Sequence, residues 1–222
     1  MKRFSFLSLL IGVLSLAALV SSTSLAQSFE GVVQMTVKGE NGENAITYMM
    51  KGDVVRMEFE GGRRGPMVML RNIKEDKTVM LMSEMKSYME MTMPQAPKDK
   101  EGAPVKGKVT KTGKTEKILG YDCDQFLVKY EDKETEVWAA KGIGKFMRMS
   151  GPRQQNVYRW ENESEFKDYF PLRVVTHAGE EEKESTMEVT KIEKKSLDAA
   201  LFKVPEDFKK MEMPSFGRPP RQ

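Results

Sequence analysis

The chain has 222 residues, of which 39% are hydrophobic and 31% are charged, with one cysteine and one histidine. Its formal net charge of +3 is too small to produce a field that steers nucleic acid or another polyanion toward it. The single cysteine, Cys123, excludes an internal disulfide, so the fold has to be held together by its apolar core.

The first 26 residues are predicted to be a secretion signal. Lys2 and Arg3 precede an uncharged apolar run, and a short polar stretch follows it. Ser24 and Ala26 give the small-x-small pattern that signal peptidase accepts, so we predict cleavage after Ala26. The alternative is an uncleaved membrane anchor. Cleavage would leave a periplasmic or secreted protein without a stable anchor, carrying 34 basic and 33 acidic residues.

The rest of the chain predicts a sheet of many short antiparallel strands. Apolar and polar residues alternate with a period of two, which is typical of strands with one buried face, and turn residues separate the segments. The Gly52-Asp53 pair predicts a tight hairpin, because glycine admits a positive φ. The predicted strands are 29–38, 45–51, 54–60, 66–72, 77–83, 87–93, 115–119, 121–131, 134–139, 155–160, 171–177 and 185–193.

The sequence predicts one β-rich domain over residues 27–214. Residues 94–114 are rich in Pro, Lys, Gly and Ala, and they are predicted to form a flexible surface excursion within that domain. Ser196 is predicted to cap a helical turn that extends to Leu201. The last segment, 215–222, is rich in Pro and Arg and is predicted to be disordered.

Methionine is concentrated in the N-terminal half, where 12 of the 18 methionines lie between Met35 and Met93. A spacing of two places the methionines of each strand on one side. Three interpretations stay open: the thioethers fill an irregular core, line an adaptable cavity for lipid chains, or bind Cu(I). The residues predicted to bind an apolar ligand are Met67, Met69, Met80, Met82, Met89, Met91, Met93 and Trp138.

No motif in the sequence predicts catalysis, a metal site or a cofactor. Asp122 and Asp124 flank Cys123, and neighbouring carboxylates raise a thiol pKa, so we predict a buried structural thiol. His177 has no patterned partner. A nucleophile elbow, zinc-ligand spacing and a phosphate loop are all absent from the sequence. The sequence therefore predicts neither an enzyme nor a nucleic-acid-binding protein.

Seven segments, in order along residues 29–214, resemble a family of exported bacterial proteins known as domain of unknown function 4412. They are Phe29–Val32, Gly52–Glu58, Lys86–Met89, Ile118–Cys123, Val137–Ala139, Phe170–Arg173 and Leu197–Pro205. The last segment is also similar to the end of periplasmic lipoprotein carriers of the LolA and LolB type. That resemblance implies a strongly curved antiparallel sheet with few short helices, forming a half-barrel around an apolar cavity. Periodicity alone fits a sandwich equally well.

The leading hypothesis is a non-enzymatic periplasmic binding protein. It would hold a lipid or part of an envelope lipoprotein on the concave face of the sheet. The alternatives are an envelope scaffold or stress protein that makes a protein contact, and a Cu(I)-binding protein. The apolar side of the sheet distinguishes them, because a filled core favours a scaffold and an open concavity favours a carrier.

Overall fold

The computed structural model describes residues 29–40, 42–60, 65–75, 77–91, 107–130, 133–147, 160–177 and 184–211. The predicted signal peptide, 1–26, and the predicted disordered tail, 215–222, lie outside the described residues. The described strands are β1 (Gly31–Gly39), β2 (Gly42–Lys51), β3 (Val54–Glu60), β4 (Pro66–Asn72), β5 (Lys77–Met82), β6 (Ser87–Met91), β7 (Lys108–Ile118), β8 (Tyr121–Tyr130), β9 (Lys133–Lys141), β10 (Tyr169–His177), β11 (Ser185–Lys194) and β12 (Lys209–Lys210). The described helices are short 3-10 turns, η2 (Ser83–Met85), η4 (Trp160–Asn162), η5 (Ser164–Phe166) and η6 (Ala199–Phe202).

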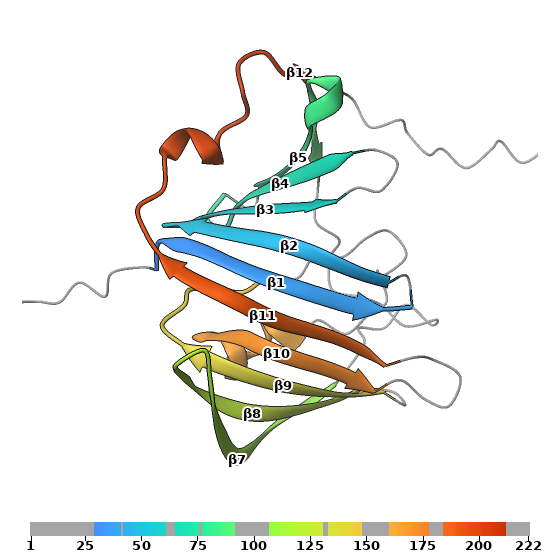
Figure 1. Cartoon of the computed structure of the whole chain (residues 1–222), viewed down its shortest axis with the longest axis vertical. Helices are drawn as coiled ribbons and strands as arrows, with labels where there is room; N and C mark the ends of the chain where they lie inside the picture. Colours follow the sequence, from blue (N-terminus) through green and yellow to red (C-terminus); the bar gives the residue numbers. More distant parts are fainter. Residues whose placement is uncertain are drawn as a thin grey trace, which may run out of the picture.

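These twelve strands form one open sheet in the order β12-β6-β5-β4-β3-β2-β1-β11-β10-β9-β8-β7 (Figure 1). Strands β1 to β6 form one meander and β7 to β11 a second, and the two join where β11 pairs with β1. Neighbours are antiparallel except β12, which pairs parallel with β6. The structure therefore confirms the predicted mainly β fold with a single antiparallel sheet.

The sheet is curved, and contacts between rings on distant strands show toward which face it curls. Tyr48 of β2 and Phe170 of β10 have ring centroids 5.6 Å apart, although β1 and β11 lie between their strands. A flat sheet would separate β2 and β10 by about 14 Å. We call the face toward which the sheet curls, which carries Val33 and Met35, the core face, and the opposite face the outer face.

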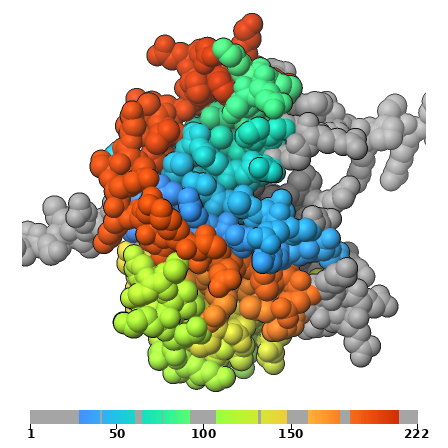
Figure 2. Space-filling view, in the orientation of Figure 1, coloured from blue at the N-terminus to red at the C-terminus, as the bar shows by residue number. Residues whose placement is uncertain are grey.

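Most of the main hydrophobic cluster lies on the core face, and a second, smaller cluster lies on the outer face of β4 and β5. The smaller cluster consists of Val68, Leu70, Val79 and Leu81. Val204 and Phe208, from the segment 195–211 that we call the C-terminal strap, pack against it. Figure 2 shows this segment, in red, beside the teal and green strands of the first meander. Strands β4 and β5 are therefore apolar on both faces.

Hydrogen bonds hold the C-terminal strap against the sheet. Lys51 donates to the carbonyl of Leu197 at 2.8 Å, and Arg56 donates to the carbonyl of Leu201 at 2.8 Å. Further along, the amide of Met211 donates to the carbonyl of Tyr88 at 2.7 Å. The strap thus covers apolar side chains that would otherwise face solvent.

Several predicted elements match the structure and others need correction. Strands 54–60 and 66–72 are confirmed at both ends, as is the tight turn at Gly52, whose φ is 58°. The predicted excursion 94–114 is wrong for residues 108–114, which belong to β7. Strand β7 forms an edge of the sheet, where a lysine- and threonine-rich strand needs little apolar surface. Residues 94–106 lie outside the described residues.

Two shorter corrections concern local structure. Trp160, predicted to end a strand, begins the 3-10 helix η4, and residues 155–159 of that strand lie outside the described part. The cap of the C-terminal turn is Asp198, whose carboxylate accepts from the amide of Ala200 at 2.9 Å. The predicted cap, Ser196, instead lies with its hydroxyl 3.4 Å from Glu30 Oε1.

Candidate functional site

Four methionines stand side by side across four adjacent strands of the core face. The register pairs Met57 with Met69, Met69 with Met80, and Met80 with Met89. Residues paired directly across strands have Cβ atoms about 4.5–5.5 Å apart, so their side chains are neighbours. We call this row the methionine ladder. It extends from β3 to β6 and continues the row of Tyr48, which pairs with Met57.

The rows on either side of the ladder lie on the same face, because alternate residues of a strand share a side. One flanking row is Phe59, Met67, Met82 and Ser87, and the other is Val55, Arg71, Thr78 and Met91. These three rows make up the methionine half of the core face. The predicted site residues Met67, Met69, Met80, Met82, Met89 and Met91 are therefore brought together, and Met93 lies outside the described residues.

Burial along the ladder falls from one end to the other. Met57 is 2% exposed and Met69 is 5% exposed, and both belong to the main core cluster. Met80 and Met89, nearer the edge of the sheet, are only partly buried. Met67 and Met91 in the flanking rows are also partly buried. The first two methionines of the ladder are therefore core side chains, and the other two are partly exposed.

The other half of the core face is filled by aromatic rings. Phe126 contacts Phe166 with ring centroids 4.5 Å apart, Phe166 contacts Trp160 at 4.8 Å, and Phe170 contacts Phe146 at 5.4 Å. The helices η4 and η5 that carry two of these rings lie behind β9 and β10 in Figure 1. We call this region the aromatic half.

Tyr48 connects the two halves and is locked in place by its hydroxyl. The hydroxyl donates to the carbonyl of Lys145 at 3.1 Å and accepts from the amide of Met147 at 3.1 Å. Burial raises the pKa of Tyr48, so the phenol is neutral at physiological pH. Both of its hydrogen-bonding roles are satisfied, which makes it a structural group.

Trp138, which was predicted to line the same site as the methionines, lies on the outer face. Val137 pairs with Val174 of the core face, so the next residue points the opposite way. The Trp138 ring packs under Arg173, 5.5 Å from its guanidinium carbon, and its Nε1 donates to Glu136 at 2.5 Å. The prediction was wrong because Trp138 was assigned from its aromatic bulk without the register of β9.

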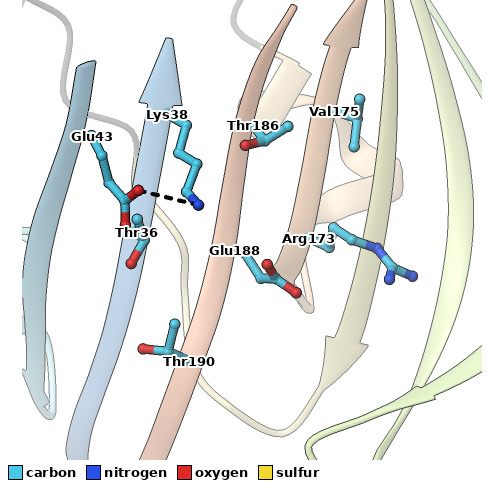
Figure 3. Close-up of a pocket in the computed structure, with 8 residues that line it drawn as sticks. All are labelled: Thr36, Lys38, Glu43, Arg173, Val175, Thr186, Glu188 and Thr190. Atoms are coloured by element: carbon cyan, nitrogen blue, oxygen red, sulfur yellow. Dashed lines mark ion pairs between the residues drawn. The ribbon is translucent and has the colours of Figure 1, made fainter.

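A polar pocket lies on the outer face over β1, β2, β10 and β11 (Figure 3). Within the pocket, Lys38 and Glu43 form an ion pair at 3.1 Å, drawn as a dashed line in Figure 3. Arg173 points from the pocket toward Glu116, with which it forms an ion pair. The lining residues are Thr36, Lys38, Glu43, Arg173, Val175, Thr186, Glu188 and Thr190. These side chains are those expected of the solvent-facing positions of a sheet.

The single cysteine and the single histidine are a buried structural group and a surface group, respectively. Cys123 is 1% exposed, and burial raises the pKa of its thiol, so the predicted buried thiol is confirmed. His177 is exposed, with Nδ1 3.1 Å from a carboxylate oxygen of Glu184. Within the described residues, no three His, Cys, Asp or Glu side chains gather in a way that could hold a metal ion.

Three buried polar residues of the methionine half, Arg71, Thr78 and Ser87, were missed in the sequence. Arg71 is 8% exposed and its Nη1 donates to Thr78 Oγ1 at 2.7 Å. Ser87 is 4% exposed, and its hydroxyl has no hydrogen-bond partner within the described part of the chain. The alternation that points Met67 and Met69 inward also points Arg71 inward, so the signal was present in the sequence.

Across residues 29–211, with the gaps given above, no helix has the length and apolar character that would let it cross a membrane. Among curated proteins, none matches the sequence.

Three solved structures that match the chain share little sequence with it. PNGF-II is 16% identical, with a TM-score of 0.47, and the match covers 83% of this chain and 31% of that one, so the chain spans about a third of its length. A domain described as outer membrane lipoprotein-sorting, from Vibrio parahaemolyticus, is 10% identical over 78% of this chain and 87% of its own, with a TM-score of 0.34. A DUF1329 family protein from Desulfovibrio piger is 8% identical over 80% and 91%, with a TM-score of 0.36.

The sequence itself matches the family described as Domain of unknown function (DUF4412) over residues 29–208. That range includes all the strands described above except β12. The chain therefore belongs to the DUF4412 family.

Proposed function

We propose that the protein is a binding protein of the cell envelope that holds an apolar ligand, a lipid or an acyl chain, on the methionine half of the core face. The observation that carries this proposal is the fall in burial along the methionine ladder. Met57 and Met69 are core residues, whereas Met80 and Met89 on the same face are only partly buried. The location in the envelope follows from the predicted export signal.

Thioether side chains suit a ligand of variable shape. Methionine is unbranched, flexible and polarizable, so a row of methionines repacks around chains of different length. The sites that bind apolar ligands are usually concave and mostly apolar, with a few polar groups that orient the ligand. The curved core face, with Arg71, Thr78 and Ser87 beside the ladder, fits that description.

Two measurements test the proposal. Lipid extracted from the gently purified exported protein is identified by mass spectrometry, and fatty acids are titrated against the neutral fluorescent probe N-phenylnaphthylamine. We expect saturable displacement, with affinity rising about fourfold for each added methylene. Blank lipid extracts together with no saturable displacement would contradict the proposal.

A matched pair of variants locates the binding surface. Met80→Glu places a charge on the ladder, and we expect it to weaken displacement at least about tenfold, because apolar contact is replaced by a charge that must lose its water. Met85→Glu is the control, because Met85 is 59% exposed on η2. Equal effects of the two substitutions would show that the ligand binds elsewhere.

The ladder also supports a second candidate function, Cu(I) binding. Thioethers are soft ligands that select Cu(I), and the ladder brings four of them into adjacent positions. The double variant Met80→Leu with Met89→Leu separates the two functions, because leucine keeps the apolar volume and removes the sulfur. Loss of Cu(I) binding against a competing chelator, with lipid binding retained, would assign copper to the ladder.

A further inference from the structure

The polar pocket of the outer face, shown in Figure 3, lies beside two β-bulges. Thr190 is the extra residue of a bulge in β11 opposite β1, and Leu172 is the extra residue of a bulge in β10 opposite β9. A bulge bends its strand and redirects the side chains beside it, and bulges often adjoin functional sites. The pocket has a volume of about 270 Å³, just below the range of about 300–1,000 Å³ of sites that hold drug-sized molecules. It therefore has room for one small ligand.

Glu188 of β11 stands in the middle of this pocket. The register pairs it with Thr36 of β1 on one side and with Arg173 of β10 on the other. Along β11 its neighbours in the pocket lining are Thr186 and Thr190. Residues paired directly across strands have Cβ atoms about 4.5–5.5 Å apart, so these side chains surround the carboxylate of Glu188.

The two cations of the pocket pair with other carboxylates and leave Glu188 free. Lys38 forms its ion pair with Glu43 at 3.1 Å, and Arg173 forms its ion pair with Glu116, which lies outside the pocket lining. Within the described part of the chain, Glu188 has no hydrogen bond or ion pair. Its two carboxylate oxygens are therefore available to accept hydrogen bonds from a ligand.

The hydroxyl groups beside Glu188 add donors and further acceptors. Thr190 donates to the carbonyl of Gln34 at 3.3 Å, which leaves its oxygen able to accept. The hydroxyls of Thr36 and Thr186 make no hydrogen bond with any residue that the structure describes, and each can both donate and accept. The pocket thus offers a mixture of donors and acceptors around one charged acceptor.

We propose that the outer pocket binds a neutral saccharide, whose hydroxyl groups donate to Glu188 and exchange hydrogen bonds with Thr36 and Thr186. A sugar hydroxyl both donates and accepts, which matches this mixture. The lining contains two basic and two acidic residues, so their formal charges cancel and the pocket has no excess charge that would select a charged ligand. Val175 gives the lining an apolar side chain for the C–H groups of a sugar ring. The site lies on the face opposite the methionine half, so this inference does not depend on the proposed function.

The test begins with an array of immobilised neutral saccharides that carries hexoses, N-acetylhexosamines and their oligomers, together with glucosamine. We expect the purified protein to bind at least one neutral saccharide above background, and calorimetric titration of that saccharide then gives its Kd. An array without any bound saccharide would overturn the inference. Binding of glucosamine without N-acetylglucosamine or a hexose would show that the pocket selects an ammonium group, and would also overturn it.

Substitutions connect the binding to the pocket. Glu188→Gln keeps the shape and removes the charge, and we expect it to raise the Kd about tenfold or more, because hydrogen bonds to a charged group are lost. Its unfolding free energy should match that of the native protein, since the carboxylate bonds to no described residue.

The matched control is Glu193→Gln on the same strand, outside the pocket lining, where the carboxylate pairs with Lys191 and Lys195. This variant should bind the saccharide as the native protein does. An unchanged Kd in Glu188→Gln, or an equal rise in Glu193→Gln, would contradict the assignment of the saccharide to the outer pocket.

Discussion

The aromatic half and the methionine half of the core face are both apolar, but the described residues fill them to different extents. In the aromatic half, η4 and η5 bring Trp160 and Phe166 onto the sheet, and Phe126 beneath them is 1% exposed. In the methionine half, Met80 and Met89 remain partly exposed. Rigid rings stabilise one part of the sheet, and the proposed function assigns ligand binding to the part that carries flexible thioethers.

The largest effect is expected in the aromatic half. Phe126→Ala removes a ring that contacts both Phe166 and Tyr169. We expect it to lower the free energy of unfolding by about 3–5 kcal/mol, because a cavity replaces a fully buried ring. Urea unfolding followed by tryptophan fluorescence measures the loss. A loss below about 1 kcal/mol would show that this half is not the stabilising core.

The cost of truncating a methionine in unfolding free energy should differ between the two ends of the methionine ladder by nearly as much as Phe126→Ala costs. Met57→Ala is expected to cost about 2–5 kcal/mol of unfolding free energy, since Met57 is 2% exposed. Met89→Ala should cost less than about 1 kcal/mol, since a partly exposed side chain loses little on truncation. Met89→Ala should nevertheless weaken ligand displacement. Equal stability costs at the two ends would remove the distinction between filled and accessible thioethers.

A substitution on the outer face should leave ligand binding unchanged. Trp138→Phe keeps a ring under Arg173 and removes the hydrogen bond from Nε1 to Glu136. We expect a loss of about 1 kcal/mol in the free energy of unfolding and the same displacement curve as the native protein. Weakened displacement in a folded Trp138→Phe variant would place the ligand on the outer face after all.

The smallest effect is expected when acid protonates Glu30, which helps to hold the C-terminal strap. Lys51 and the amide of Leu197 hydrogen-bond Glu30, at 2.5 and 2.7 Å, and lower the pKa of its carboxyl group. A lowered folded-state pKa means that the stabilisation is present above the ordinary carboxyl pKa and is lost as the pH falls through the folded value. The protection factor of the Leu197 amide against hydrogen exchange, which is the measured rate corrected for the intrinsic pH dependence of exchange, should therefore fall below about pH 4. In Glu30→Gln this acid dependence should be absent, and its persistence would exclude Glu30 as the cause.

Most of the fold could be predicted from alternation, because each strand of the first meander has turn residues at both ends. Strands 54–60 and 66–72 were placed correctly for that reason. Strand β7 was only partly predicted, because an edge strand exposed on both faces has no apolar alternation to read.

The candidate site could be predicted only in part. The spacing of Met67, Met69, Met80 and Met82 placed each pair on one side of its strand, but their alignment into a row depends on pairing between strands. Trp138 was misplaced for the same reason, since no local pattern shows which face of the sheet it occupies. Arg71 was overlooked because an arginine in a strand is usually solvent-facing, whereas here its register with Thr78 points it inward.

Oxidation footprinting of the methionines is the most direct test of a ligand on the methionine half. Mild peroxide treatment, with and without saturating tetradecanoate, is followed by peptide mass spectrometry. Binding should slow sulfoxide formation at Met80 and Met89 and leave the rate at Met85, which is 59% exposed on η2, unchanged. Equal oxidation of Met80 and Met89 in the presence and absence of bound tetradecanoate would contradict the account.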